Sequence, residues 1–91
     1  MRTAELRTAA LIERWIEPDF ARPGPAYARL KDYGIHIWAL IGHLPAAKND
    51  VAQVASDYHI PVEAVEAALA YYHQHRTAID AKLEADAAYV T

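Results

Sequence analysis

The side chains best suited to chemistry in this 91-residue chain are its five histidines. His73 and His75 are two residues apart, so on a helix they point about 200° apart and cannot share one metal ion. His36 and His43 would share a helix face but lie two turns apart, about 10 Å, which is too far for a common zinc ion at about 2 Å per ligand. The chain has no cysteine. We therefore expect no metal site and no cofactor.

A hydrolytic or acid–base site would need two carboxylates, or a nucleophile with a base, facing one pocket. Asp57 and His59 flank a predicted turn, and Ser56 is the nucleophile nearest to them. The simpler role for this pair is to keep the turn polar. The three glycines are scattered and form no loop that could cradle a phosphate. The sequence therefore predicts a protein that is not an enzyme.

The positive charges are the next candidates for a function. The formal net charge is −3, which argues weakly against broad nucleic-acid binding because phosphate neutralisation needs clustered cations. Arg22, Arg29 and Lys31 do cluster in the sequence, and further arginines precede them at Arg2, Arg7 and Arg14. If DNA is bound, Arg22, Arg29 and Lys31 are the expected phosphate contacts. The alternative is that they form a solvated basic surface.

The segment Pro18–Pro25 (PDFARPGP) divides the chain, because three prolines and a glycine cannot continue a helix or a central strand. The arm before it is ambiguous. Thr3–Glu13 has helical propensity, whereas the β-branched and aromatic residues that follow favour a strand. We expect one or two short strands, near Ile12–Glu17 and Ala28–Leu30, that pair with their copies in a homodimer and so leave no exposed edge.

From Ile35 onward the apolar residues recur with the period of a helix. The pattern predicts one helix that ends at Pro45, a second that begins at Asp50, and a third that begins at Pro61 and runs to about Ala85. The third would be roughly 35–40 Å long, which exceeds the width of so small a core, so its end should project or pack on another chain. The predicted fold is one mainly α domain over residues 1–91. It comprises an N-terminal arm with short strands (1–34), a three-helix core (35–76), and the end of the long helix with its tail (77–91).

The second and third helices have the spacing of a helix-turn-helix DNA-binding motif. Ala55 is small where the helices must approach closely, His59 and Ile60 make the turn, and Val65 and Leu69 face the core. The positions of the third helix that we expect to be exposed are Glu63, Ala64, Glu66, Ala67, Ala70 and Gln74. Glutamates in a groove would meet phosphates unless each accepted a hydrogen bond from a cytosine amine. The motif can therefore equally be a three-helix scaffold with no DNA contact.

Three stretches carry a resemblance to a known family: RWIEP, ARLKDYGIHIWALIGHL and, most specifically, DYHIPVEAVEAALAYY. Together they resemble domain of unknown function family 433, a group of small bacterial proteins, over Arg14 to about Leu83. The family's Ile-x-Gly-Thr-Arg-Ile-Pro-Val run is replaced here at residues 30–37. Its Gly-Gly-Lys-Pro stretch gives way to residues 22–25, Arg-Pro-Gly-Pro. The resemblance implies a helix-turn-helix domain with a short N-terminal β-element, and an antitoxin encoded beside a PIN-like ribonuclease toxin.

These observations predict a cytoplasmic, antitoxin-like protein that binds and neutralises such a toxin. Regulation of its own operon is a further expectation. The alternative is a dimeric DNA-binding regulator without a toxin partner. No apolar run approaches the ~20 residues of a membrane span, so we expect no membrane contact. Trp15 lies on an apolar arm with little of its own to pack against, which suggests contact with a second copy or a partner. The expected partner-binding residues are Trp15, Tyr71, His75, Ile79 and Leu83.

Overall fold

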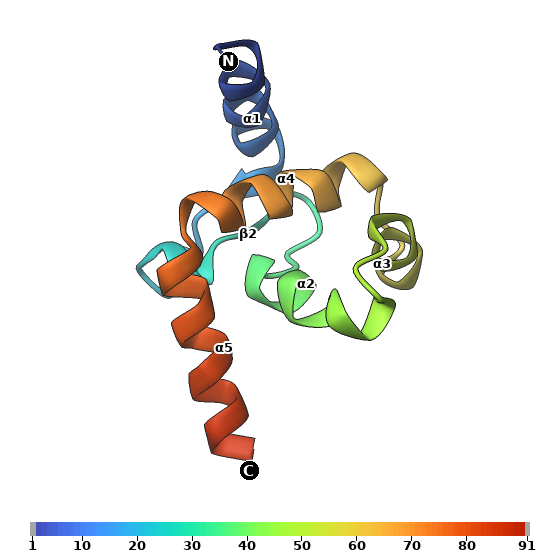
Figure 1. Cartoon of the computed structure of the whole chain (residues 1–91). Coiled ribbons are helices and arrows are strands. Elements are labelled where there is room, and N and C mark those ends of the chain that lie inside the picture. The colour runs from blue at the N-terminus through green and yellow to red at the C-terminus, as the bar shows by residue number, and fades with distance from the viewer. Residues whose placement is uncertain (1, 91) are drawn as a thin grey trace.

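The computed structural model describes residues 2–90 of the chain and the side chains of residues 5–88. The described residues form five α-helices, two 3-10 helices and a two-stranded sheet (Figure 1). In chain order these are α1 Arg2–Trp15, β1 Ile16–Glu17, η1 Pro25–Tyr27, β2 Arg29–Leu30, α2 Ile37–His43, η2 Pro45–Ala47, α3 Val51–Tyr58, α4 Val62–Gln74 and α5 Arg76–Val90. The prediction of a mainly α fold with a short N-terminal β-element and a long C-terminal helix is confirmed.

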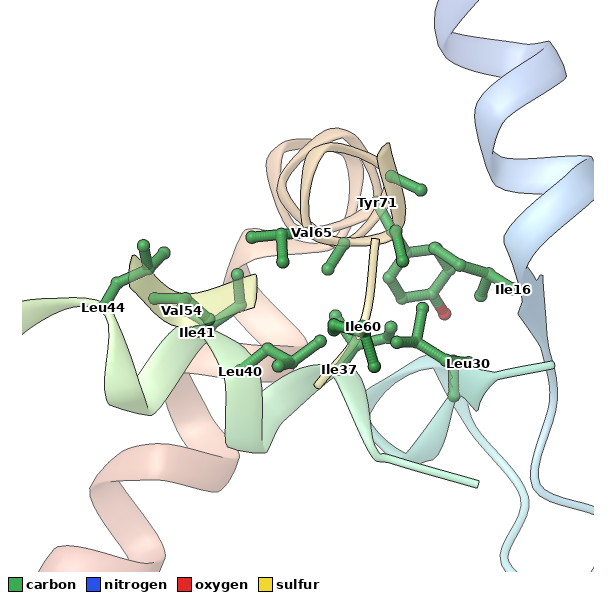
Figure 2. Packing of buried hydrophobic residues seen from close by; sticks show 14 of the residues in the cluster. Ile16, Leu30, Ile37, Leu40, Ile41, Leu44, Val54, Ile60, Val65 and Tyr71 are labelled. Atoms are coloured by element: carbon green, nitrogen blue, oxygen red, sulfur yellow. The ribbon is translucent and has the colours of Figure 1, made fainter. Parts of the chain in front are cut away.

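Helices α2, α3 and α4 form the predicted three-helix core. Asp50 caps α3 by accepting a hydrogen bond from the backbone N–H of Gln53. The helix ends at Tyr58, and its C-cap, His59, adopts a left-handed conformation with φ of 57°. Pro61 stands one position outside α4, as its N-cap. The apolar faces meet around Val54 and Val65, which have almost no exposed surface (Figure 2). Local capping and turn residues therefore set these boundaries, and burial holds the helices together.

Helix α4 lies at the centre of the molecule. It contacts α2 and α3 on one side and α1 on the other. Its alanines Ala64, Ala67 and Ala68 are completely buried, because small side chains let neighbouring helices approach closely. Figure 1 shows α1 and α5 extending from this centre in different directions, with the two termini at opposite ends of the molecule. The result is an elongated shape of 42 × 29 × 27 Å.

The N-terminal arm differs from the prediction of a strand near Ile12–Glu17. The helix continues through Trp15, and β1 contains only Ile16 and Glu17. This strand pairs antiparallel with β2 of the same chain, with Ile16 opposite Leu30. This pairing lies within one chain, and the expected pairing with a second copy stays a prediction. Lys31, directly after β2, ties this strand to the end of α1. Its backbone N–H donates to the carbonyl of Trp15, and its ammonium donates to the carbonyl of Glu13. A cation at this end of α1 is also favoured by the helix dipole.

The single long helix predicted from Pro61 to about Ala85 is also wrong, because the chain breaks at His75. That residue leaves the helical region, with φ of −129° and ψ of 33°, and its N–H donates to the carbonyls of Tyr71 and Tyr72. The break turns α5 back onto the core, where Ile79 is fully buried. Further along α5, Leu83 packs so closely on α2 that a Cβ at Gly42 would lie 3.1 Å from its Cδ2 atom. None of the described helices is long and apolar enough to cross a membrane.

Candidate functional site

Glu63, the residue that made α4 a doubtful DNA reader, attaches α1 to α4. Its Oε1 atom accepts a hydrogen bond from the indole N–H of Trp15 at 2.8 Å. The guanidinium of Arg14 lies 3.5 Å from the same oxygen and also stacks 5.3 Å from the centroid of the Trp15 ring. Trp15 was predicted to contact a partner, but it is half-buried against its own chain and uses its only polar atom there. It therefore positions α1 over α4.

The face of α4 that would enter a DNA groove is largely covered. Two of the positions that we expected to be exposed, Glu66 and Gln74, are exposed. Ala64 and Ala67 are fully buried instead. Glu63 and Ala70 are half-buried. A recognition helix must present consecutive turns to base edges, and here α1 occupies that space. The side chains of Ala64 and Ala67 are therefore not accessible to base edges, whereas those of Glu66 and Gln74 are exposed.

The three expected phosphate contacts have different surroundings. The Arg29 guanidinium donates to Glu17 at 2.8 Å across the two-stranded sheet, so its charge is neutralised locally. Lys31 is half-buried and is used at the end of α1, as described above. Arg22 is exposed, with its guanidinium 5.7 Å from the centroid of the Tyr27 ring. Arg22 is therefore the one of the three that is free to meet a phosphate.

The predicted partner-binding residues of the C-terminal region are mostly used inside the chain. Tyr71 is buried and its hydroxyl donates to the carbonyl of Pro25 at 2.9 Å, while Ile79 is completely inaccessible. His75 is half-buried and lies 4.3 Å from Tyr71 between ring centroids, and Leu83 is half-buried against α2. The assignment of Tyr71 and Ile79 to a partner surface is wrong, because the break at His75 folds this segment back onto the core.

No family model, no curated protein and no solved structure matches this chain. A candidate site must therefore be built from the chain's own surface.

Among the side chains of residues 5–88, the most exposed large apolar ones are Phe20 at 83 % and Leu6 at 70 % exposure. Phe20 lies in the proline-rich segment between β1 and η1. Leu6 lies on the first half of α1, which extends beyond α4 (Figure 1). Exposed apolar groups of this size often mark contacts with other proteins. Neither residue belongs to an apolar stripe of the sequence, so periodicity indicated no role for either one.

A cleft of about 250 Å³ opens beside Phe20's segment. Ile12 and Ile16 line it from the arm, Pro18 and Pro25 from the segment itself, and Tyr71 from α4. Glu17 adds one carboxylate, which is held by Arg29. The cleft is smaller than the roughly 300–1,000 Å³ of pockets that hold drug-sized ligands. Its size and apolar walls suit one large side chain.

Two Asp–His pairs connect other parts of the surface. Asp19 Oδ2 and His36 Nε2 are 3.0 Å apart, and Asp57 Oδ2 and His43 Nε2 are 2.8 Å apart. Hydrogen bonding to the histidine is the main cause that lowers the pKa of each aspartate below its usual value. In the part of the chain that the structure describes, no three histidine, aspartate or glutamate side chains lie close enough to hold a metal ion. Asp57 is thus part of a link between α2 and α3, and Asp19 fixes the proline-rich segment to the start of α2.

Proposed function

We propose that this chain is a cytoplasmic protein-binding subunit that acts as an antitoxin and silences a PIN-like ribonuclease. The observation that carries the first part is the coverage of α4 by α1. The helix that would read DNA is occupied by the chain's own Trp15–Glu63 contact. The identity of the partner rests on the resemblance of residues 14–83 to domain of unknown function family 433. The exposed apolar side chains of Leu6 and Phe20 are then the surface available for binding another protein.

The surface that we propose for the toxin is the outer face of α1. Leu6 and Ala10 are four residues apart, so they lie on the same face of the helix, and both are exposed. Arg7 and Arg14 are seven residues apart and flank that face on one side. A ribonuclease active site that holds metal ions is lined by carboxylates, so an apolar helix face with a basic flank is complementary to it.

Co-expression with the product of the adjacent gene tests this proposal. We expect the two proteins to purify as one complex and the ribonuclease activity of the partner to be suppressed. Leu6→Glu should disrupt the complex, because it places a carboxylate in the apolar face. Val62→Glu is the matched control, since Val62 is also exposed but lies at the start of α4. Recovery of two separate species from the wild-type pair would refute the proposal.

A second candidate is a dimeric DNA-binding regulator, which the observed helix–turn–helix geometry of α3 and α4 favours. The left-handed His59 and the buried Ile60 form the turn of such a motif. Because α4 is covered, DNA contact would have to come from phosphate-binding residues such as Arg22. A gel shift with the DNA upstream of the gene should then weaken steeply with salt and be lost in Arg22→Glu. The absence of any shift at low salt would remove this candidate.

A further inference from the structure

The proline-rich segment at residues 18–25 carries an exposed aromatic ring and also forms a wall of the cleft beside it. Phe20 projects from this segment with 83 % of its surface exposed, while Pro18 and Pro25 line the cleft. The segment is held in place. Asp19 contacts His36 at 3.0 Å and accepts a hydrogen bond from the N–H of Ala21 at 2.9 Å. Phe20 is therefore presented by an ordered loop, and little conformational freedom is lost when the ring is bound.

The cleft is equally well defined. Ile16 and Tyr71 both line it, lie close together (Figure 2) and are buried core residues. The hydroxyl of Tyr71 donates to the carbonyl of Pro25, another lining residue. An apolar cleft of about 250 Å³ is below the usual range for small-molecule pockets. A buried aromatic side chain in such a cleft is a common anchor at protein interfaces.

We propose that two copies of this chain associate about a two-fold axis, with Phe20 of each copy inserted into the cleft of the other. A two-fold interface requires one surface patch to be complementary to itself. This patch meets that requirement because the segment that carries the ring also supplies Pro18, Gly24 and Pro25 to the cavity, whose other walls come mainly from α1, β1 and α4. The charges agree as well. Arg22 is exposed two residues from Phe20, and Glu17 lines the cleft with its Oε2 atom held by Arg29. Each Arg22 would therefore join an existing ion pair of the second copy. The inference does not depend on the proposed antitoxin function.

The expected strength follows from the area. An aromatic side chain buries roughly 150–250 Å², so two rings and the two clefts that receive them bury roughly 600–1,000 Å² in total. Stable interfaces bury about 1,200–2,000 Å². The dimer should therefore be weak and in exchange with the monomer, with a dissociation constant in the micromolar range.

Sedimentation velocity of the full chain over about a thousandfold range of concentration, centred on the micromolar, tests the proposal. The mean mass should rise from monomer to dimer. Phe20→Ala should raise the dissociation constant at least about tenfold, as expected for an anchor residue. Leu6→Ala removes the other highly exposed apolar side chain and should leave the constant within about twofold. Both positions are exposed, so circular dichroism should show unchanged folding.

A second variant tests the cavity side. Ile12→Trp should fill the cleft from α1 and weaken the dimer while Phe20 is intact. A wild-type chain that stays monomeric at every concentration would overturn the proposal. A monomer in which Phe20 fills the cleft of its own chain would overturn it in the same way. A dimer indifferent to Phe20→Ala, or one disrupted by Leu6→Ala instead, would overturn it too. If the wild-type chain forms the dimer but does not bind the toxin, only the proposed function is refuted.

Discussion

Glu63 provides the most direct test of how α1 is held over α4, because it accepts the only hydrogen bond of the Trp15 indole. Hydrogen bonds to charged groups contribute about 1.5–3 kcal/mol when well shielded. The Glu63 side chain is 45 % exposed, so we expect this hydrogen bond to contribute about 1 kcal/mol to the free energy of unfolding. The exposed contact with Arg14 adds at most a few tenths. Glu63→Ala should therefore lower the free energy of unfolding by about 1 kcal/mol and the melting temperature by about 4–8 °C in a domain of this size.

A double-mutant cycle with Trp15→Phe isolates the contact. Trp15→Phe keeps an aromatic ring but removes the indole N–H, and its other packing losses cancel in the cycle. Urea denaturation followed by circular dichroism should give a coupling free energy of about 1 kcal/mol. Glu66→Ala is the control, since Glu66 is exposed on the same helix and should change stability by at most about 0.5 kcal/mol.

A coupling within about 0.3 kcal/mol of zero, the error of such cycles, would refute the geometry. It would mean that α1 does not rest on α4 through Trp15 in solution. The face of α4 that contains Ala64 and Ala67 would then be accessible, and the steric argument against groove binding would fail.

Three further measurements test other contacts. Hydrogen bonds lower the pKa of Asp57 in the folded chain. Its contribution to the free energy of unfolding is therefore present above the unfolded pKa near 3.9 and is lost as pH falls through the folded value. In Asp57→Asn the free energy of unfolding should fall less steeply at acid pH, and an unchanged acid dependence would contradict this. The hydrogen bond from Tyr72 to Asp80 raises the pKa of Tyr72, so this contribution is lost as pH rises through the raised value. Asp80→Ala should let Tyr72 ionise at lower pH in an absorbance titration, and an unshifted curve would exclude the contact. Ile79→Ala should cost about 2–5 kcal/mol in urea denaturation, and a loss under about 1 kcal/mol would show that α5 does not return to the core.

The three core helices were predictable because their signals are local and agree with one another. The stripe from Ile37 to Leu44 has one period, and Pro45 stops it. Asp50 supplies a cap that is used as expected, and Pro61 marks the start of α4 to within one residue. Burial then follows from the same period, since Val54 and Val65 are among the most buried residues.

The arm was not predictable from local preference. Ile12, Trp15 and Ile16 suit a strand as well as a helix, so the choice is made by tertiary contact. Here α4 offers a surface of alanines and one glutamate that accepts the Trp15 indole, and a helix is the element that fits it. The strand that remains begins only where Leu30 is available as its partner.

The break at His75 and the candidate interface were hidden for related reasons. Between Pro61 and Ala85 the sequence has no glycine or further proline, so nothing local announces a helix end. The turn is stabilised from a distance, by Tyr71 held at Pro25 and by Ile79 in the core. Phe20 is similar. Its exposure depends on how the surrounding segment is fixed to α2 by Asp19, which the order of residues does not reveal.

The alanines of α4 show why helix-turn-helix spacing alone does not indicate DNA binding. Small side chains at successive turns are what a recognition helix needs to approach bases, and also what a central helix needs when it is packed on two sides. Burial distinguishes the two cases, and Ala64 and Ala67 are fully buried between α4 and its neighbours. The exposed apolar side chains that could contact other molecules lie mainly on other elements. Leu6 on α1 and Phe20 on the proline-rich segment belong to different elements, so toxin binding and self-association should be separable by single substitutions.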